Sequence, residues 1–141
     1  AMFEKILLAV DGSEHALHAA EIAGNLARSE ASSSLRVIAV YESVPEYLGE
    51  PNAQALIDAH MLRAETILTE AVKKVGEIPG SIETEVLSGS PAEVIIAVAS
   101  AENSDLIVMG SRGLGRLSGL LIGSHSQKVV GHAPCPVLIV R

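Results

Sequence analysis

Aromatic residues and positive charge are both scarce in this sequence. Aromatic side chains make up 2% of the 141 residues, and the formal net charge is −7. Proteins that bind nucleic acid usually present a basic surface and often stack bases on aromatic rings. The composition therefore argues against nucleic-acid binding. Any small anion that binds here must be held by a local positive site within an acidic molecule.

Long apolar runs and cysteine are scarce as well. No run approaches the ~20 apolar residues of a membrane span, and no basic region followed by an apolar stretch opens the chain. We therefore expect neither a membrane protein nor a signal peptide. Cys135 is the single cysteine, which is typical of a reducing compartment and favours a cytoplasmic location. Its position between two prolines is interpreted as that of a small core residue rather than a reactive thiol.

Small aliphatic residues are abundant, and they alternate between strand-like and helix-like segments. Residues 82–87 alternate apolar and polar side chains, which predicts a half-exposed strand nearer a sheet edge. The other predicted strands are mostly continuous apolar runs, typical of a parallel sheet covered on both faces; they lie at 3–10, 35–41, 105–109 and 136–140. Helices are expected at about 14–30, 53–75, 91–101 and 124–131.

Helix starts and turns are marked by polar residues at fixed offsets. Ser13 is expected to cap the first helix. The segment Ser90-Pro91-Ala92-Glu93 is interpreted as a capping box with proline at the first helical position. Residues 110–122 carry four glycines and are expected to form a loop.

The alternation of strands and helices predicts an α/β fold, with a parallel sheet between two layers of helices. We find no internal repeat or linker and expect one doubly wound domain over residues 1–141. Ligands of such sheets bind beyond the carboxyl ends of the strands, where the strand order changes direction. If the first and fourth strands are neighbours, Asp11 and the glycines after Met109 face one crevice.

The glycine-rich segment has features suited to phosphate. It begins Gly110-Ser111-Arg112-Gly113 and, nine residues later, continues with Gly123-Ser124. Glycines let a backbone approach phosphates closely. The expected helix from residue 124 would direct its N-terminal N–H groups and partial positive charge at an anion. Ser126 adds a hydroxyl, and Arg112 and Arg116 add positive charge.

The spacing Gly-x2-Gly-x9-Gly-Ser resembles the nucleotide-binding pattern of the ATP-binding branch of the universal stress protein family. The resemblance covers the whole chain, through ILLAVDGSEHA, SGSPAEVI, DLIVMGSRG and GSHSQKVVGHAPCPVLIVR. It implies a five-stranded, Rossmann-like sheet in the order 3-2-1-4-5, similar to adenine nucleotide alpha hydrolases. It also implies ATP, or another adenine nucleotide, as the ligand, with Mg²⁺ on the phosphates and Asp11 as a weak candidate metal ligand.

The resemblance also assigns binding residues. Ala9, Val10 and Asp11 would lie beside the adenine and ribose, and Val40 would touch the base. The residues that would border or hold the ribose and phosphates are Met109, Gly110, Arg112, Gly113, Gly123, Ser124, His125 and Ser126. His125 departs from the family pattern, which has a small or β-branched residue there, so the preferred number of phosphates stays open.

Simpler interpretations exist for several of these residues. Ser124 and Gln127 also have the spacing of a capping box. Asp11 could be a turn residue, and Arg112 and Arg116 could be solvated loop charges. His15 and His18 lie three apart on one predicted helix and could chelate a metal, but an exposed helical face is the better interpretation. Each of these side chains therefore has a purely structural alternative.

The sequence favours a nucleotide-binding regulatory protein that senses or signals by nucleotide occupancy, and the resemblance implies a role in the stress response. One alternative is a slow ATPase or phosphotransferase, although a lone carboxylate at the crevice argues against efficient catalysis, and we assign no catalytic residue. The other is a nucleotide-free interaction module. The resemblance implies a homodimer through the last strand, Pro136-Val140, because an apolar sheet edge invites pairing with a second copy.

Overall fold

A computed structural model describes residues 2–30, 33–111 and 123–141 of the protein. Its sheet is five-stranded and all-parallel, in the order β3-β2-β1-β4-β5. This confirms the α/β class and the strand order expected above. The strands are β1 (Lys5–Val10), β2 (Ser34–Tyr41), β3 (Ile82–Ser88), β4 (Leu106–Gly110) and β5 (Val137–Val140). The helices are α1 (Glu14–Ser29), the short 3₁₀ helix η1 (Glu46–Leu48), α2 (Asn52–Val75), α3 (Pro91–Ala101) and α4 (Ser124–His132).

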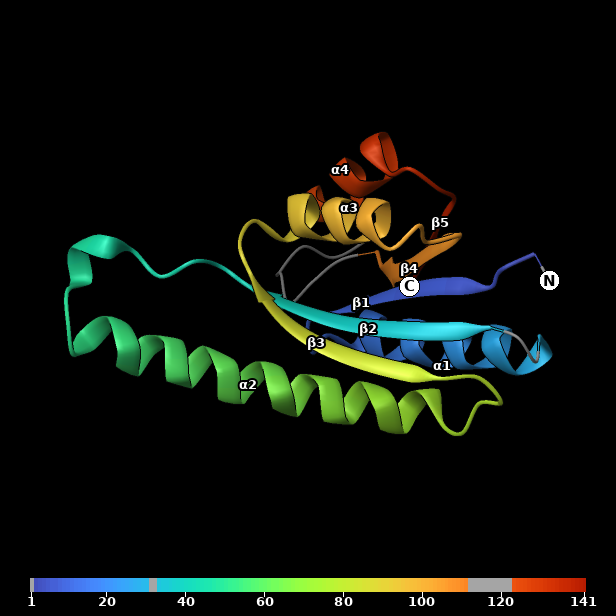
Figure 1. The fold of residues 1–141 in the computed structure, drawn as a ribbon, viewed down its shortest axis with the longest axis horizontal. Helices are drawn as coiled ribbons and strands as arrows, with labels where there is room; N and C mark the ends of the chain where they lie inside the picture. The colour runs from blue at the N-terminus through green and yellow to red at the C-terminus, as the bar shows by residue number, and fades with distance from the viewer. Residues whose placement is uncertain (1, 31–32, 112–122) are drawn as a thin grey trace.

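The helices cover the sheet in two layers. Figure 1 shows α1 and α2 on one face and α3 and α4 on the other. Successive side chains of a strand point to opposite faces, so β1 serves both cores. Ile6 and Leu8 pack with α1 and α2, whereas Leu7 and Ala9 pack with α3 and α4. This double burial explains why residues 6–10 of β1 are all apolar.

The first helix starts as the sequence predicts. The Ser13 hydroxyl accepts a hydrogen bond from the Ala16 N–H at 3.1 Å. Gly12 has φ of +86°, a left-handed conformation that favours glycine. The chain therefore turns sharply from β1 into α1 immediately beyond the carboxyl end of the central strand.

Two local predictions were wrong. Gly110 belongs to β4 rather than to the loop, because it pairs with Val140 of β5. Ser90 does occupy the N-cap of α3 and Pro91 follows it, but within the described residues the Ser90 side chain makes no capping hydrogen bond. Glu93 does not reach back either; its carboxylate pairs with Lys128 of α4 at 3.0 Å. An ion pair between helices replaces the predicted capping box.

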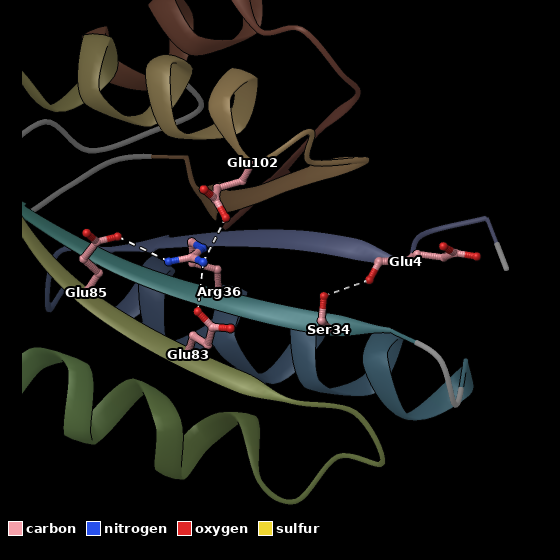
Figure 2. A network of polar contacts seen from close by, with 6 residues as sticks. All are labelled: Glu4, Ser34, Arg36, Glu83, Glu85 and Glu102. Carbon is pink, nitrogen blue, oxygen red and sulfur yellow. Dashed lines mark hydrogen bonds and ion pairs between the residues drawn. The ribbon is translucent and has the colours of Figure 1, made fainter.

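One polar network stands on the α3 side of the sheet (Figure 2). The Arg36 guanidinium of β2 lies between carboxylates of β3 and the carboxylate that follows α3. Its nitrogens are 2.9 Å from Glu83, 3.4 Å from Glu85 and 2.9 Å from Glu102. The network ties β2, β3 and the end of α3 together.

The polar connection after β2 contains η1 and leads into α2. In Figure 1 the N-terminal part of α2 extends beyond the carboxyl ends of the strands, and its C-terminal part lies along the sheet. The buried residues of α2 begin only at Ala64. Among the described residues, none of the helices is long and apolar enough to cross a membrane.

Candidate functional site

The first and fourth strands are neighbours, as the crevice requires. Ala9 of β1 lies opposite Met109 of β4, and β2 flanks β1 on its other side. From β1 the chain proceeds outward to β2 and β3, and after crossing back it proceeds the other way to β4 and β5. The change of direction therefore falls between β1 and β4, where ligands of doubly wound sheets bind.

Three of the predicted site residues share one face of the sheet at this point. Ala9 and Met109 belong to the core under α3 and α4, and Val40 packs against the same core. Val10 does not join them, because its side chain lies in the core under α1 and α2. Only the backbone of Val10 is therefore available on the α3 and α4 side.

Asp11 follows β1 directly and has an exposed side chain. Its Oδ1 accepts a hydrogen bond from the Ser13 N–H at 3.0 Å, so Asp11 does act as a turn residue. Val10 pairs with Ala39, which places Asp11 at the level of the next residue of β2, Val40. Asp11 thus lies at the carboxyl edge of the sheet, level with Val40.

The exit of β4 is packed tightly against the start of α1. A Cβ added to Gly110 would lie 2.9 Å from the Cβ of His15 and 3.0 Å from the backbone nitrogen of Ala16. Such contacts are too short for any other residue without a shift of backbone. Gly110 is therefore required for the close approach of β4 and α1, whatever else it does.

Ser111 and Gly123, which flank residues 112–122, are joined by a hydrogen bond. The Gly123 N–H donates to the Ser111 carbonyl at 2.6 Å, and the Ser111 N–H donates to the Val140 carbonyl at 2.7 Å. These bonds place the start of α4 next to the ends of β4 and β5. The first turn of α4 consequently lies at the same edge of the sheet as Asp11.

The N-terminus of α4 is held by Ser126 rather than by Ser124. Gly123 is the N-cap and Ser124 is the first helical residue, so the alternative capping box of Ser124 and Gln127 was wrong. No side chain among the described residues caps this helix end. The buried Ser126 hydroxyl instead donates to the Gly110 carbonyl at 2.8 Å. Ser124 and His125 are exposed.

Part of the predicted phosphate segment lies outside the described residues. Arg112, Gly113 and Arg116 belong to that part. In the remainder of the chain, no group of three or more histidine, cysteine, aspartate or glutamate side chains could hold a metal ion. Asp11, the weak metal candidate from the sequence, therefore belongs to no such group among the described residues.

The structure adds His15 and Ser111, which the sequence analysis did not assign to the site. His15 is half-buried rather than exposed, and its Nδ1 lies 2.7 Å from the Ser111 hydroxyl. His18, one turn later, contacts the Arg141 carbonyl instead. The two histidines therefore have different partners and do not form a chelating pair. The exposed helical face was wrong for His15 and right for His18. Because β1 and β4 are neighbours, the first turn of α1, which follows β1, lies beside Ser111, which follows β4. The expected pairing of these strands was the sequence signal that could have indicated the contact.

The fold and the arrangement at its switch point define a class of protein: a doubly wound α/β protein with an anion-suited helix N-terminus beside the central strand. The chain belongs to the universal stress protein family, whose model matches residues 2–141.

Similar proteins support this membership along the full length. A universal stress protein of Thermus aquaticus, encoded in the QAH/OAS sulfhydrylase 3' region, is 48% identical over 140 residues, covering 99% of this chain and 100% of the relative. The solved universal stress protein UspA from Lactobacillus plantarum has a TM-score of 0.88 at 29% identity, covering 100% of this chain and 99% of that one. A universal stress protein solved in complex with cAMP shares the fold with a TM-score of 0.72 at 23% identity, covering 100% and 99%.

Proposed function

We propose that this protein binds an adenine nucleotide, ATP in the first place, and acts as a regulatory protein of the stress response. One observation carries the proposal. The first turn of α4, with no side-chain cap among the described residues, lies at the switch point beside β1 and β4. The first N–H groups of an α-helix have no partner within the helix and attract anions. A phosphate chain supplies oxygens that donors of this kind can bind.

Apolar side chains of the core near the start of α4 suit the base. Ala9, Val40 and Met109 lie on one face of three adjacent strands. A purine could lie against these side chains with its ribose near Asp11 and its phosphates toward Gly123 and Ser124. The solved universal stress protein that contains cAMP holds an adenine nucleotide on the same fold. At its level of identity it supports the proposal through the fold and not through individual residues.

The charge of the molecule is consistent with a site that depends on backbone donors. The chain carries a formal charge of −7, and among the described α4 residues the Lys128 ammonium is already paired with Glu93. Arg112, Mg²⁺ or both would have to offset the repulsion between ATP and the protein. We therefore propose that Mg²⁺ accompanies ATP and that removing it weakens binding.

The decisive experiment identifies and then titrates the ligand. The protein is purified, denatured, and any released small molecule is identified by chromatography and mass spectrometry. The emptied protein is then titrated with ATP, ADP, AMP, cAMP and GTP by calorimetry, with and without Mg²⁺. We expect stoichiometric binding of adenine nucleotides and weaker binding of GTP. A chain that binds none of them would contradict the proposal and leave the nucleotide-free interaction module.

Turnover separates a sensor from an enzyme. Bound ATP is followed over hours, and ADP is measured against a blank without protein. We expect occupancy without sustained ADP release, because the Oδ1 of Asp11, the carboxylate that we assign to the crevice, is used in the turn. Continuous ADP release would favour the slow ATPase.

We also propose a cytoplasmic location, because the chain has a single cysteine, which is typical of a reducing compartment.

We also propose a homodimer through β5. Among the described strands, β5 pairs with β4 on one side only, and Leu138 is 37% exposed. Strand edges of this kind pair readily with a second copy. Sedimentation should give a dimer at micromolar concentration, and Leu138→Lys should shift it toward monomer, while Leu62→Lys on the exposed surface of α2 should not. A monomeric unaltered protein would overturn this proposal.

A further inference from the structure

The contact between His15 and Ser111 links the two halves of the proposed site. His15 lies in the first turn of α1, which follows Asp11 and the central strand. Ser111 lies directly after β4 and is 5% exposed. The imidazole Nδ1 and the hydroxyl oxygen are 2.7 Å apart, within the range of a good hydrogen bond. The contact is possible because α1 approaches β4 closely at Gly110.

Each polar group of Ser111 is engaged by a different element. Its N–H donates to Val140 of β5, and its carbonyl accepts from Gly123, the N-cap of α4. Its hydroxyl reaches His15 of α1. The Ser111 backbone therefore sets where α4 begins, and His15 is the side chain that fixes the Ser111 side chain in turn.

A second hydroxyl secures the same helix from the opposite direction. Ser126 of α4 donates to the Gly110 carbonyl at 2.8 Å. That bond holds the body of the first turn, whereas the bonds of Ser111 hold the N-cap. A buried hydroxyl that loses its partner either turns to find another or leaves a polar group unsatisfied. Without His15, Ser111 and with it Gly123 would lose one of their restraints.

We propose that His15 is a positioning residue of the nucleotide site, which holds Ser111 and through it the phosphate-binding end of α4. This inference rests on the proposed function. His15 acts on the phosphate half of the site and leaves the apolar side chains of Ala9, Val40 and Met109 unchanged. Its loss weakens the recognition of phosphates and spares the recognition of adenosine.

The test compares ATP with adenosine in the same variant. Affinities are measured by calorimetry, or by competition for weak ligands, for the unaltered protein and for His15→Ala, His15→Asn and His18→Ala. We expect His15→Ala to lose affinity for ATP by about tenfold, as for one hydrogen bond at the upper end of its usual worth, and to bind adenosine within about twofold. His15→Asn should recover most of the ATP affinity, because its amide stands near the position of Nδ1.

His18→Ala is the matched control. It removes a histidine one turn along the same helix that contacts the Arg141 carbonyl and not Ser111. Both nucleotide and nucleoside should bind to it as to the unaltered protein. Ser111→Ala combined with His15→Ala should cost no more than either change alone, since residues in contact are non-additive. If His15→Ala does not fold, Ser111→Ala carries the same ATP-to-adenosine comparison.

The outcomes separate this inference from the proposed function. An unaltered protein that binds no ATP overturns the proposed function and this role with it. Normal ATP binding by His15→Ala, or an equal loss of ATP and adenosine affinity, overturns only the positioning role. A loss confined to ATP, restored by asparagine and absent in His18→Ala, supports it.

Discussion

The two faces of the sheet differ in what they bury and in what they leave open. On the α1 and α2 face, buried side chains extend from β1 and β4 through α1 to the end of α2 at Val75. On the α3 and α4 face the buried cluster is smaller and includes Ala9 and Met109. Beside it stand the Arg36 network (Figure 2) and the first turn of α4. The first face is a continuous core, whereas the second combines a core with polar edges.

The difference suggests that the two faces of the sheet have different roles, one in stability and the other in the candidate site. A large, closely packed core stabilises the fold, so the opposite face can keep helix ends, glycines and exposed polar groups near the carboxyl edge. Because β1 contributes to both faces, neighbouring residues of one strand should respond differently to substitution. The following predictions test this comparison, from the largest expected effect to the smallest.

Truncation of adjacent leucines should separate the two faces. Leu8 points to the α1 and α2 core and Leu7 to the other, and both are 0% exposed. We expect Leu8→Ala to lower the free energy of unfolding by about 2–5 kcal/mol, measured by urea denaturation, because it leaves a cavity in the larger cluster. Leu7→Ala should cost less and should also weaken ATP binding. A larger loss for Leu7→Ala would contradict the proposed division.

Removal of the Ser126 hydroxyl should affect both stability and the site. The bond to the Gly110 carbonyl is buried, and Ser126 is 3% exposed. We expect Ser126→Ala to lower the free energy of unfolding by about 1–3 kcal/mol, because a buried acceptor loses its partner. Ser124→Ala, two residues earlier and exposed, is the control and should change stability by less than about 0.5 kcal/mol. Similar losses for both serines would show that the buried bond is unimportant.

The Arg36 network should stabilise the α3 and α4 face by a smaller amount. Arg36 contacts three carboxylates and its side chain is 26% exposed. We expect Arg36→Ala to lower the free energy of unfolding by about 1 kcal/mol at low salt, since exposed and half-exposed pairs contribute little individually. The loss should shrink in high salt if repulsion among the remaining carboxylates causes it.

Lys73→Ala is the control for Arg36. Lys73 lies on α2 and pairs with Glu70 alone at 3.9 Å, with both side chains well exposed. Its removal should leave thermal unfolding nearly unchanged. Equal effects of the two substitutions would mean that the network has no advantage over an isolated surface pair.

Cys135 should show the smallest effect, one of reactivity rather than stability. Burial, and to a lesser extent the nearby Asp105 carboxylate, raises the pKa of the Cys135 thiol. At roughly pH 8–9 the folded protein then carries less thiolate than the unfolded chain. We expect slow alkylation by iodoacetamide in the native state and faster alkylation in urea.

The same pKa shift has a defined sign for stability. Because the folded state keeps its thiol proton to higher pH, stability should decline slightly as pH rises above the pKa of the unfolded thiol. Cys135→Ser should remove that decline. Rapid alkylation of the native protein near neutral pH would contradict the interpretation of Cys135 as a core residue.

Much of the fold could be predicted because its signals are local. Continuous apolar runs at β1 and β4 predicted strands buried on both faces, and the alternating run at β3 predicted an edge strand, which the sheet order confirms. Ser13 was identified as a cap from its position before a helical segment. The failures occurred where a tertiary contact overrode a local pattern. Gly110 fitted a loop by composition but a strand by pairing, and Glu93 fitted a capping box but found Lys128.

Where the candidate site residues lie in the fold was predictable in part for the same reason, whereas their role in binding stays a prediction. Asp11, Gly123 and Ser124 follow from spacing, and the strand order places them at one edge of the sheet. The direction of the Val10 side chain, into the core opposite Ala9, also follows once β1 is a strand, yet the family resemblance obscured it. Nothing in the spacing of His15 and Ser111 indicates that they touch, since they are far apart in the chain.

By itself, the sequence determined the alternation of strands and helices, the order of the strands through its family resemblance, and the family to which the chain belongs. Periodicity and turn chemistry involve only a few neighbouring residues, so strands, helices and turns can be recognised from the sequence alone. Only the tertiary structure decided that Ser126 holds Gly110, that His15 meets Ser111, and that Glu93 pairs with Lys128. Those contacts depend on how closely α1 and α4 approach β4, a distance set by the packing of both cores together.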